Sequence, residues 1–320
     1  MLQKFIFCIV LISNVCYSQL SNKHWLPPLH SRLDYIVEEQ YVYLSTPEPV
    51  SFAVTITDGG GNPIAGSPFF ISQGNPVRVF ISNQQPSVMF LGGDDLHQVI
   101  GDKGLILEGS KEFYASFRVN SEAHAETLIM KGKEALGTEF RLGSLPQSSF
   151  GTARNFVASF MATENNTRIR VNEYDTGVIF YADGTEILSN ALSFRLNAGQ
   201  VVVITGYSDV LENLSGFVGA LVKSDKPIVV NSGNALAGMR TAEDGQDFAL
   251  DQIVPLEKVG TQYALVRGNG SNFSEYPLVI ATQDNTEIFV NGSTTALASL
   301  SAGQFYLINN SNYQGVNNKN

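Results

Sequence analysis

The chain has 320 residues, of which 43% are hydrophobic and only 16% are charged, so a large apolar core can form. It carries 30 Asp and Glu against 20 Lys and Arg, and the resulting net charge of −10 argues against nucleic acid and anionic membrane surfaces as partners. With 20 Phe, 12 Tyr, 29 Gly and 12 Pro, the composition favours β-structure with many turns over a helical bundle.

Residues 1–18 differ from the rest of the chain. Lys4 is their only charge, an apolar run follows it, and small residues precede a possible cleavage before Gln19. This pattern predicts a secretory signal peptide, and the apolar run is too short for a permanent membrane span. Both cysteines, Cys8 and Cys16, lie in this leader. The mature chain, with a net charge of −11 after loss of Lys4, therefore has no disulfide and no Cys nucleophile. No later segment is apolar enough to predict a transmembrane span.

A phrase of twelve residues occurs twice in the chain. Residues 162–173 read ATENNTRIRVNE and residues 281–292 read ATQDNTEIFVNG, with seven identical positions. An earlier and less similar copy places Thr46 117 residues before Thr163, which in turn lies 119 residues before Thr282. Other short segments recur in the same order, so the sequence predicts a repeat of about 118 residues.

The predicted organisation follows this period. It consists of a signal peptide at 1–18, an extended segment at 19–40, a first β-repeat at 41–155, a second at 156–275 and a partial third at 276–320. Two explanations of the partial copy stay open. The chain belongs to a longer polypeptide, or the partial copy completes the sheet begun by the N-terminal part.

The turn inside the phrase has Asn165-Asn166 in one copy and Asp284-Asn285 in the other. A two-residue turn of type I′ needs positive φ at both central residues, which Asn and Asp tolerate. The phrase therefore predicts a strand, a tight turn and a second strand, in the form of a hairpin. This reading gives the phrase an architectural role and not a catalytic one.

Short runs of alternating apolar and polar residues fill each copy, with turn residues between them. Such runs, without long stretches of helical period, predict an all-β protein built from tandem β-sandwich-like repeats. A β-propeller with two blades per repeat is the alternative fold.

No catalytic motif, nucleotide fingerprint or metal-ligand spacing is present. The four histidines form no such pattern, so we predict that they are structural or exposed to solvent. A long loop is predicted at residues 234–246. Rigid β-units commonly carry their binding residues on such loops. We take as candidate ligand-binding residues Met239, Arg240, Glu243, Asp244 and Asp247. The acidic members could alternatively hold Ca²⁺, or serve a glycosidase if two carboxylates lie close together.

Three segments carry a resemblance to a known family: the hairpin phrase at 162–167, LVKSDKPIVVNSGN at 221–234 and a segment at 247–255 that ends in Pro. Together with SNKHWLPPLHS near the N-terminus, they resemble the IgGFc-binding protein N-terminal domain family, in the form found in large secreted surface proteins of Bacteroidetes. The resemblance implies a cell-surface adhesion module, commonly followed by further repeats and a type IX secretion sorting domain. It implies no catalytic residue, so the chain is predicted not to be an enzyme.

These observations favour a secreted or cell-surface module that binds a glycan, a mucin or a surface protein through loops on a repeated β-scaffold. A carbohydrate-active hydrolase or lyase is one alternative, and a structural spacer of a large surface protein is another. No cofactor is predicted, apart from the Ca²⁺ alternative.

Overall fold

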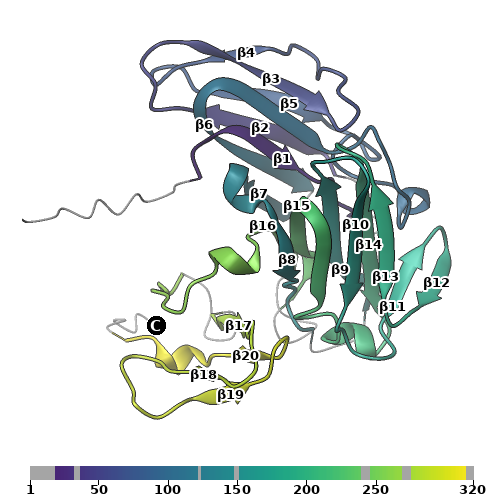
Figure 1. Ribbon diagram of the computed structural model, residues 1–320, viewed down its shortest axis with the longest axis vertical. Helices are drawn as coiled ribbons and strands as arrows, with labels where there is room; N and C mark the ends of the chain where they lie inside the picture. Colours follow the sequence, from purple (N-terminus) through teal and green to yellow (C-terminus); the bar gives the residue numbers. More distant parts are fainter. Residues whose placement is uncertain are drawn as a thin grey trace, which may run out of the picture.

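The computed structural model describes residues 19–31, 37–121, 124–147, 151–238, 246–268 and 275–314; for residues 151–153 only the backbone is described. Within these ranges the chain is all-β, and its helical segments are 3₁₀ turns of three or four residues (Figure 1). No helix there is long and apolar enough to cross a membrane. The predicted signal peptide lies outside the described residues.

The first sheet, which we call unit one, contains seven strands in the order β4-β3-β6-β2-β5, with β1 and β7 also paired to β6. Its strands are β1 (Ser21–Leu26), β2 (Glu39–Ser45), β3 (Phe52–Asp58), β4 (Phe69–Ile71), β5 (Val77–Ser82), β6 (Leu105–Ser121) and β7 (His124–Ile129).

The second sheet, unit two, repeats this arrangement in the order β13-β10-β15-β9-β14, with β8 and β16 also paired to β15. Its strands are β8 (Gly137–Arg141), β9 (Gly151–Ala162), β10 (Thr167–Asn172), β13 (Leu192–Leu196), β14 (Val201–Ser208), β15 (Leu221–Ala237) and β16 (Asp247–Ile253), and a separate hairpin joins β11 (Ile179–Ala182) to β12 (Thr185–Leu188).

One long strand organises each unit. The 17-residue strand β6 pairs with β1 and β3 through its first half and with β2 and β7 through its second half. The equally long β15 pairs with β8 and β10 and then with β9 and β16. Each long strand thus runs through two half-sheets that fold around one core, and the expected tandem β-sandwich-like repeats are confirmed.

Alternation along the strands decides which side chains enter the core. Val42 and Leu44 of β2 are buried while their neighbours Tyr41 and Tyr43 point outward, as expected for a period of two. The second half of β15 is an exception, because every residue from 228 to 237 is buried. Both faces of this half-strand are covered, one by the core of unit two and the other by unit one.

The repeated phrase forms a turn between half-sheets, and the predicted hairpin is wrong. Strand β9 pairs with β14 and β15, whereas β10 pairs with β13 and β15, so the two strands flanking the turn do not pair with each other. Only Asn166 and Asn285 have positive φ, at 60° and 57°, which excludes the two-residue type I′ turn. The chain crosses from one half-sheet to the other at this turn.

Side chains of the phrase fix the crossing in both later copies. Asn165 Oδ1 accepts a hydrogen bond from the Ala198 amide at 3.1 Å, and Asp284 Oδ1 accepts the corresponding bond from Ala302 at 3.0 Å. The hydroxyl of Thr163 donates to the Pro227 carbonyl of β15 at 2.7 Å. The phrase therefore has the architectural role that the sequence predicts, although by a different geometry.

Units one and two share a buried junction. Trp25 of β1 packs in one apolar cluster with Met161, Val201 and Val229 of unit two. The Asn231 side chain of β15 donates to the Pro27 carbonyl at 2.8 Å, in a buried position. These contacts place the two units against each other as adjoining bodies (Figure 1).

The third copy, at the bottom of Figure 1, forms two small sheets that pair β17 with β20 and β18 with β19. Its strands are β17 (Leu278–Ile280), β18 (Thr286–Ile288), β19 (Ala298–Leu300) and β20 (Phe305–Leu307). None of them joins unit one, so the explanation in which the partial copy completes the N-terminal sheet is wrong. The third copy instead lies against unit two, where a Cβ built at Gly219 would come within 1.9 Å of the Gly303 carbonyl.

Candidate functional site

The predicted ligand-binding loop falls mostly outside the described residues, which include only Asp247 of its five candidates. Asp247 begins β16, and its Oδ1 accepts a hydrogen bond from the Ala125 amide of unit one at 3.0 Å. The same oxygen lies 3.7 Å from Nδ1 of His124. This carboxylate thus connects β16 to β7, and the ligand-binding role of the loop stays a prediction.

The clearest concentration of recognition groups lies on the outward face of β10, β13 and β15, which we call the basic face. It consists of Arg168, Arg170, Arg195 and Lys223, all exposed. Strand alternation puts the β10 arginines on one side of the sheet, because buried Ile169 separates them. Strand register then places Arg195 directly opposite Arg168, and Lys223 directly opposite Arg170.

This arrangement sets like charges against each other. Side chains directly opposite on antiparallel strands have Cβ atoms about 5 Å apart, and like charges there destabilise a sheet. Two carboxylates offset part of the repulsion: Asp225 accepts from the Arg168 backbone amide at 2.7 Å, and Glu139 pairs with Lys223 at 3.0 Å. The face still holds twice as many cationic as acidic groups, in a chain whose net charge is −10.

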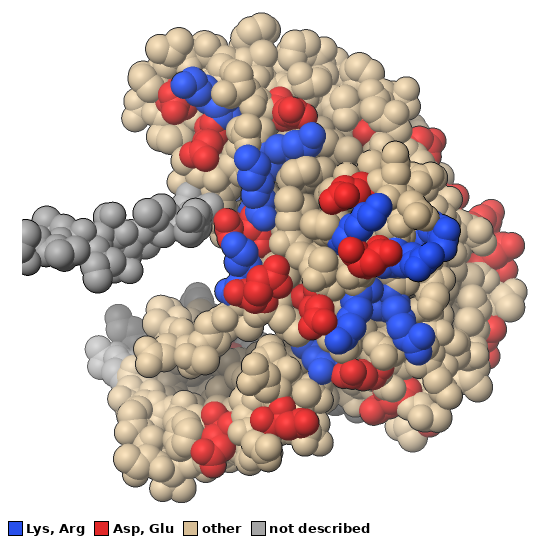
Figure 2. Space-filling view, in the orientation of Figure 1, with Lys and Arg blue, Asp and Glu red and all other residues tan. Residues whose placement is uncertain are grey.

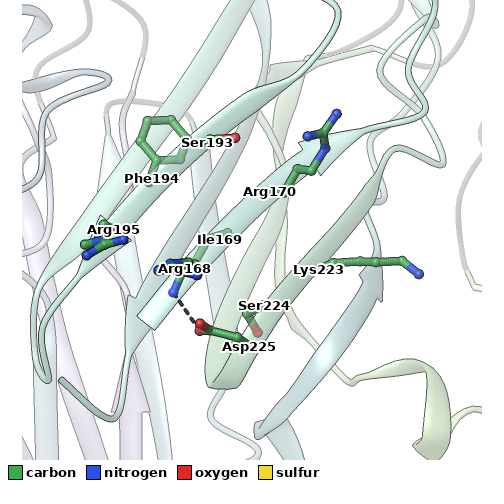
Figure 3. Close-up of a pocket in the computed structure, with 9 residues that line it drawn as sticks. All are labelled: Arg168, Ile169, Arg170, Ser193, Phe194, Arg195, Lys223, Ser224 and Asp225. Atoms are coloured by element: carbon green, nitrogen blue, oxygen red, sulfur yellow. Dashed lines mark hydrogen bonds between the residues drawn. The ribbon is translucent and has the colours of Figure 1, made fainter. Parts of the chain in front are cut away.

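The basic face borders a shallow open groove of about 530 Å³ (Figure 3). Figure 3 shows the side chains of Arg168, Arg170, Arg195 and Lys223 spread along three neighbouring strands with Asp225 at one end. In Figure 2, Lys and Arg side chains gather over this part of unit two with acidic groups between them. An open, charged surface of this kind suits contact with a macromolecule better than enclosure of a small substrate.

The other copies lack this charge. The positions of the two β10 arginines correspond in unit one to Ser51 and Ala53, and in the third copy to Glu287 and Phe289. The scaffold thus repeats while the chemistry of its outward face changes. The basic face is a feature of unit two and not a by-product of the repeat.

A second surface, which we call the aromatic face, lies on the outward side of β2, β5 and β6 in unit one. Tyr41 contacts Phe80 and Tyr43 with ring centroids 5.7 and 6.4 Å apart. Arg78 lies over the Tyr41 ring at 4.7 Å, and Arg118 lies over the Tyr43 ring at 5.3 Å. The exposed Tyr114 borders the same surface, beside a shallow groove of about 540 Å³.

The histidines with strongly shifted pKa values lie at the junction of the units and not on either face. Burial lowers the pKa of His30 to about 4, and its ring lies 3.0 Å from the Leu91 carbonyl and 3.1 Å from the Tyr207 hydroxyl of unit two. Burial also lowers the pKa of His97 to about 4, and this ring packs on Phe180 and Phe194. Both are neutral at physiological pH and serve packing.

Carboxylates do not gather into a metal centre in the described part of the chain, where no three His, Cys, Asp or Glu side chains converge. Asp251, one of the acidic residues near the predicted loop, pairs with Lys131 of unit one at 2.7 Å. Glu126 lies nearby with its pKa raised, first by burial and then by the charges of Asp247 and Asp251. These described carboxylates support the junction between β7 and β16.

Sequence reasoning missed the basic face, although the signal was present. The run TRIRVN alternates Arg with apolar residues, which places both arginines outward on a strand. Arg195 of β13 lies 27 residues after Arg168, and Lys223 of β15 lies 53 residues after Arg170. Only the strand register brings these side chains together.

A family model described as "IgGFc binding protein" matches residues 125–320. This range contains every residue of the basic face, whereas the residues of the aromatic face all precede it. No curated protein and no solved structure shows significant similarity to the chain.

Proposed function

This protein belongs to the IgGFc-binding protein family, because the family model matches more than half of the chain. From this family and the basic face, we propose that the protein is an extracellular binding module. Its basic face recognises acidic groups on a protein ligand. The observation that carries the proposal is the cross-strand array of four cationic side chains within the matched range. Such an array disfavours folding of the sheet, and an acidic partner would relieve its repulsion.

The chemistry of the face supports recognition of carboxylates. Arginine presents planar pairs of N–H donors that match a carboxylate in two parallel hydrogen bonds. Three arginines on two adjacent strands offer such donors side by side, while the rigid sheet holds them in place. Complementary charge also accelerates encounter with an acidic partner and makes the binding sensitive to salt.

The experiment compares two double variants of the full chain for binding to immobilised Fc fragment of IgG, the ligand class that the family name indicates. Arg168→Glu with Arg195→Glu replaces two of the four cations of the basic face by carboxylates and keeps a like-charged pair across the strands, as in the parent chain. Lys111→Glu with Lys133→Glu makes the same charge change at exposed positions elsewhere. We expect the first to weaken binding by about tenfold or more and the second by less than about twofold, since steering by net charge alone would affect both equally.

Equal losses in the two variants, or unchanged Fc binding in the first, would contradict the role of the basic face. Salt titration provides a second readout, because affinity through this face should fall as ionic strength rises.

A glycan ligand is the second candidate, and the aromatic face favours it. Exposed rings offer flat apolar surface to the apolar side of a sugar, while Arg78 and Arg118 can donate to its hydroxyls. We expect Phe80→Ala with Tyr114→Ala to remove glycan-array signals that Phe70→Ala, which truncates an exposed ring on another half-sheet, leaves intact. Signals that survive the double substitution would remove this candidate.

The proposed location is outside the cell, at or near a bacterial surface. It is supported by the family and by the sequence pattern of residues 1–18. We also propose that the module works within a longer surface polypeptide, of the type carried by Bacteroidetes with type IX secretion. N-terminal sequencing of secreted protein should begin at Gln19.

A further inference from the structure

In unit two, the half-sheet of β9, β14 and β15 is covered on its outward side by unit one. Val229 of β15 packs in one cluster with Trp25, and Asn231 donates to the Pro27 carbonyl at 2.8 Å. Val203 of β14 belongs to the core cluster of unit one. The outward side of this half-sheet is therefore a contact surface between units.

The aromatic face is the corresponding side of unit one. The threonine contacts fix the correspondence, because Thr46 donates to the Glu112 carbonyl of β6 as Thr163 donates to the Pro227 carbonyl of β15. Counted from these carbonyls and carried across the sheets by strand register, the matching positions are Tyr114 and Val229, Ser116 and Asn231, Tyr43 and Ser159, and Arg78 and Val203. Small or aliphatic residues on the covered side thus correspond mostly to rings and an arginine on the open side.

Two arginines of this face are held by tyrosine rings. Strand register sets Arg78 opposite Tyr43, yet its guanidinium lies over the Tyr41 ring at 4.7 Å. In the same way, Arg118 is opposite Tyr41 and lies over the Tyr43 ring at 5.3 Å. Such stacking restrains both long side chains without neutralising their charge.

Neither arginine forms an ion pair with a carboxylate in the part of the chain that the structure describes. Glu39 lies on the same side of β2 as Tyr41, but no ion pair joins it to Arg118 there. A ligand that covers these guanidinium groups removes their water, which costs free energy unless the ligand brings a negative charge. The face therefore favours an acidic ligand over a neutral one.

Exposed rings lie on both sides of Arg78. Phe80 and Tyr114 are 51% and 41% exposed. Register puts them in the rows of Tyr41 and Ser45, four residues apart along the strands, which is about 13 Å. Arg78 lies in the row between them, and the groove of about 540 Å³ is lined by Arg78 and Tyr114. Flat rings at this spacing, with a cation between them, suit a chain of sugar residues better than a single sugar.

We propose that the aromatic face binds an acidic oligosaccharide through a sugar carboxylate. The carboxylate pairs with Arg78, whose planar N–H donors match it in two parallel hydrogen bonds. Neighbouring sugars lie with their apolar sides on Phe80 and Tyr114. This inference rests on the glycan candidate of the proposed function and names the class of glycan, a chain that carries a uronic or sialic acid. It is independent of the Fc ligand of the basic face.

The experiment applies the full chain to a glycan array on which each carboxylate-bearing glycan is printed beside its methyl ester. Esterification removes the charge and keeps the sugar rings. We expect the acidic forms to bind at least about tenfold more tightly than their esters, because the ester loses the charge-assisted hydrogen bonds.

The outcomes separate this inference from the glycan candidate. Equal binding of acids and esters would overturn the inference and leave a glycan ligand in place. A preference for sulfated over carboxylated glycans would also overturn it. An array without any signal would remove the glycan candidate, and the inference with it.

A variant distinguishes recognition from folding. Arg78→Gln removes the charge, so binding of acidic glycans should fall about tenfold, to the level of the esters. Binding of the esters should change by less than about twofold, whereas a misfolded variant would lose both. Arg168→Gln makes the same charge change on the basic face and should leave both unchanged. An acid preference that survives Arg78→Gln, or that disappears in Arg168→Gln, would contradict the role of Arg78.

Discussion

Arg195 is a single side chain that lowers the stability of the sheet in which it lies. It lies opposite Arg168 on the neighbouring strand, where unlike or apolar partners would stabilise the sheet. Asp225 accepts a hydrogen bond from the backbone amide of Arg168. A residue that lowers stability at an exposed position is a reasonable candidate for recognition of a ligand.

Replacing Arg195 by Thr should therefore raise the free energy of unfolding by about 0.5 kcal/mol, since it removes the repulsion and inserts a good strand former. The control is Arg118→Thr in unit one. Arg118 donates to Thr127 at 3.1 Å and lies over the Tyr43 ring, so its loss should lower stability. Urea unfolding of both variants decides the matter; a loss of stability in Arg195→Thr would show that the arginine supports the fold.

At the scale of the element, strands were predictable and their partners were not. Alternation and turn residues located most strands, and the spacing of Thr46, Thr163 and Thr282 revealed the repeat. The hairpin was wrong because the turn chemistry of Asn165-Asn166 is local, whereas the choice of partner is not. Each flanking strand pairs with β15, which follows about 50 or more residues later.

The basic face escaped prediction for the same reason. Arg168 and Arg170 are visible as an outward pair in the sequence, but their neighbours come from two other strands. Charge that is averaged over a chain says little about a single face of one sheet.

At the scale of the whole molecule, the junction between units one and two is sensitive to acid. His30 bridges the units through Leu91 and Tyr207, and His97 packs on aromatic rings of unit two. Their pKa values of about 4 in the folded protein lie below the ordinary 6.5. The unfolded chain therefore binds these protons more readily than the folded protein does, and stability is lost as the pH falls from 6.5 toward 4.

We expect the free energy of unfolding to fall markedly between about pH 7 and about pH 4.5, with His30 alone contributing up to roughly 3 kcal/mol over its full titration. Glu126 acts in the opposite direction, because burial raises its pKa and the folded state gains its proton first. Urea unfolding at the two pH values measures the net effect. His30→Asn should flatten the slope; an unchanged slope would exclude His30 as its source.

The long strand of each unit also governs the order in which the protein can form. Arg141 of β8 and Leu221 of β15 are partners separated by 80 residues of chain. While the nascent polypeptide leaves the ribosome, β8, β9 and β10 exist without the strand that joins them, and unit two closes only once β15 has been synthesised. Pairing over such distances makes folding slow, so the waiting strands are exposed to aggregation unless a chaperone or continued transport keeps them apart.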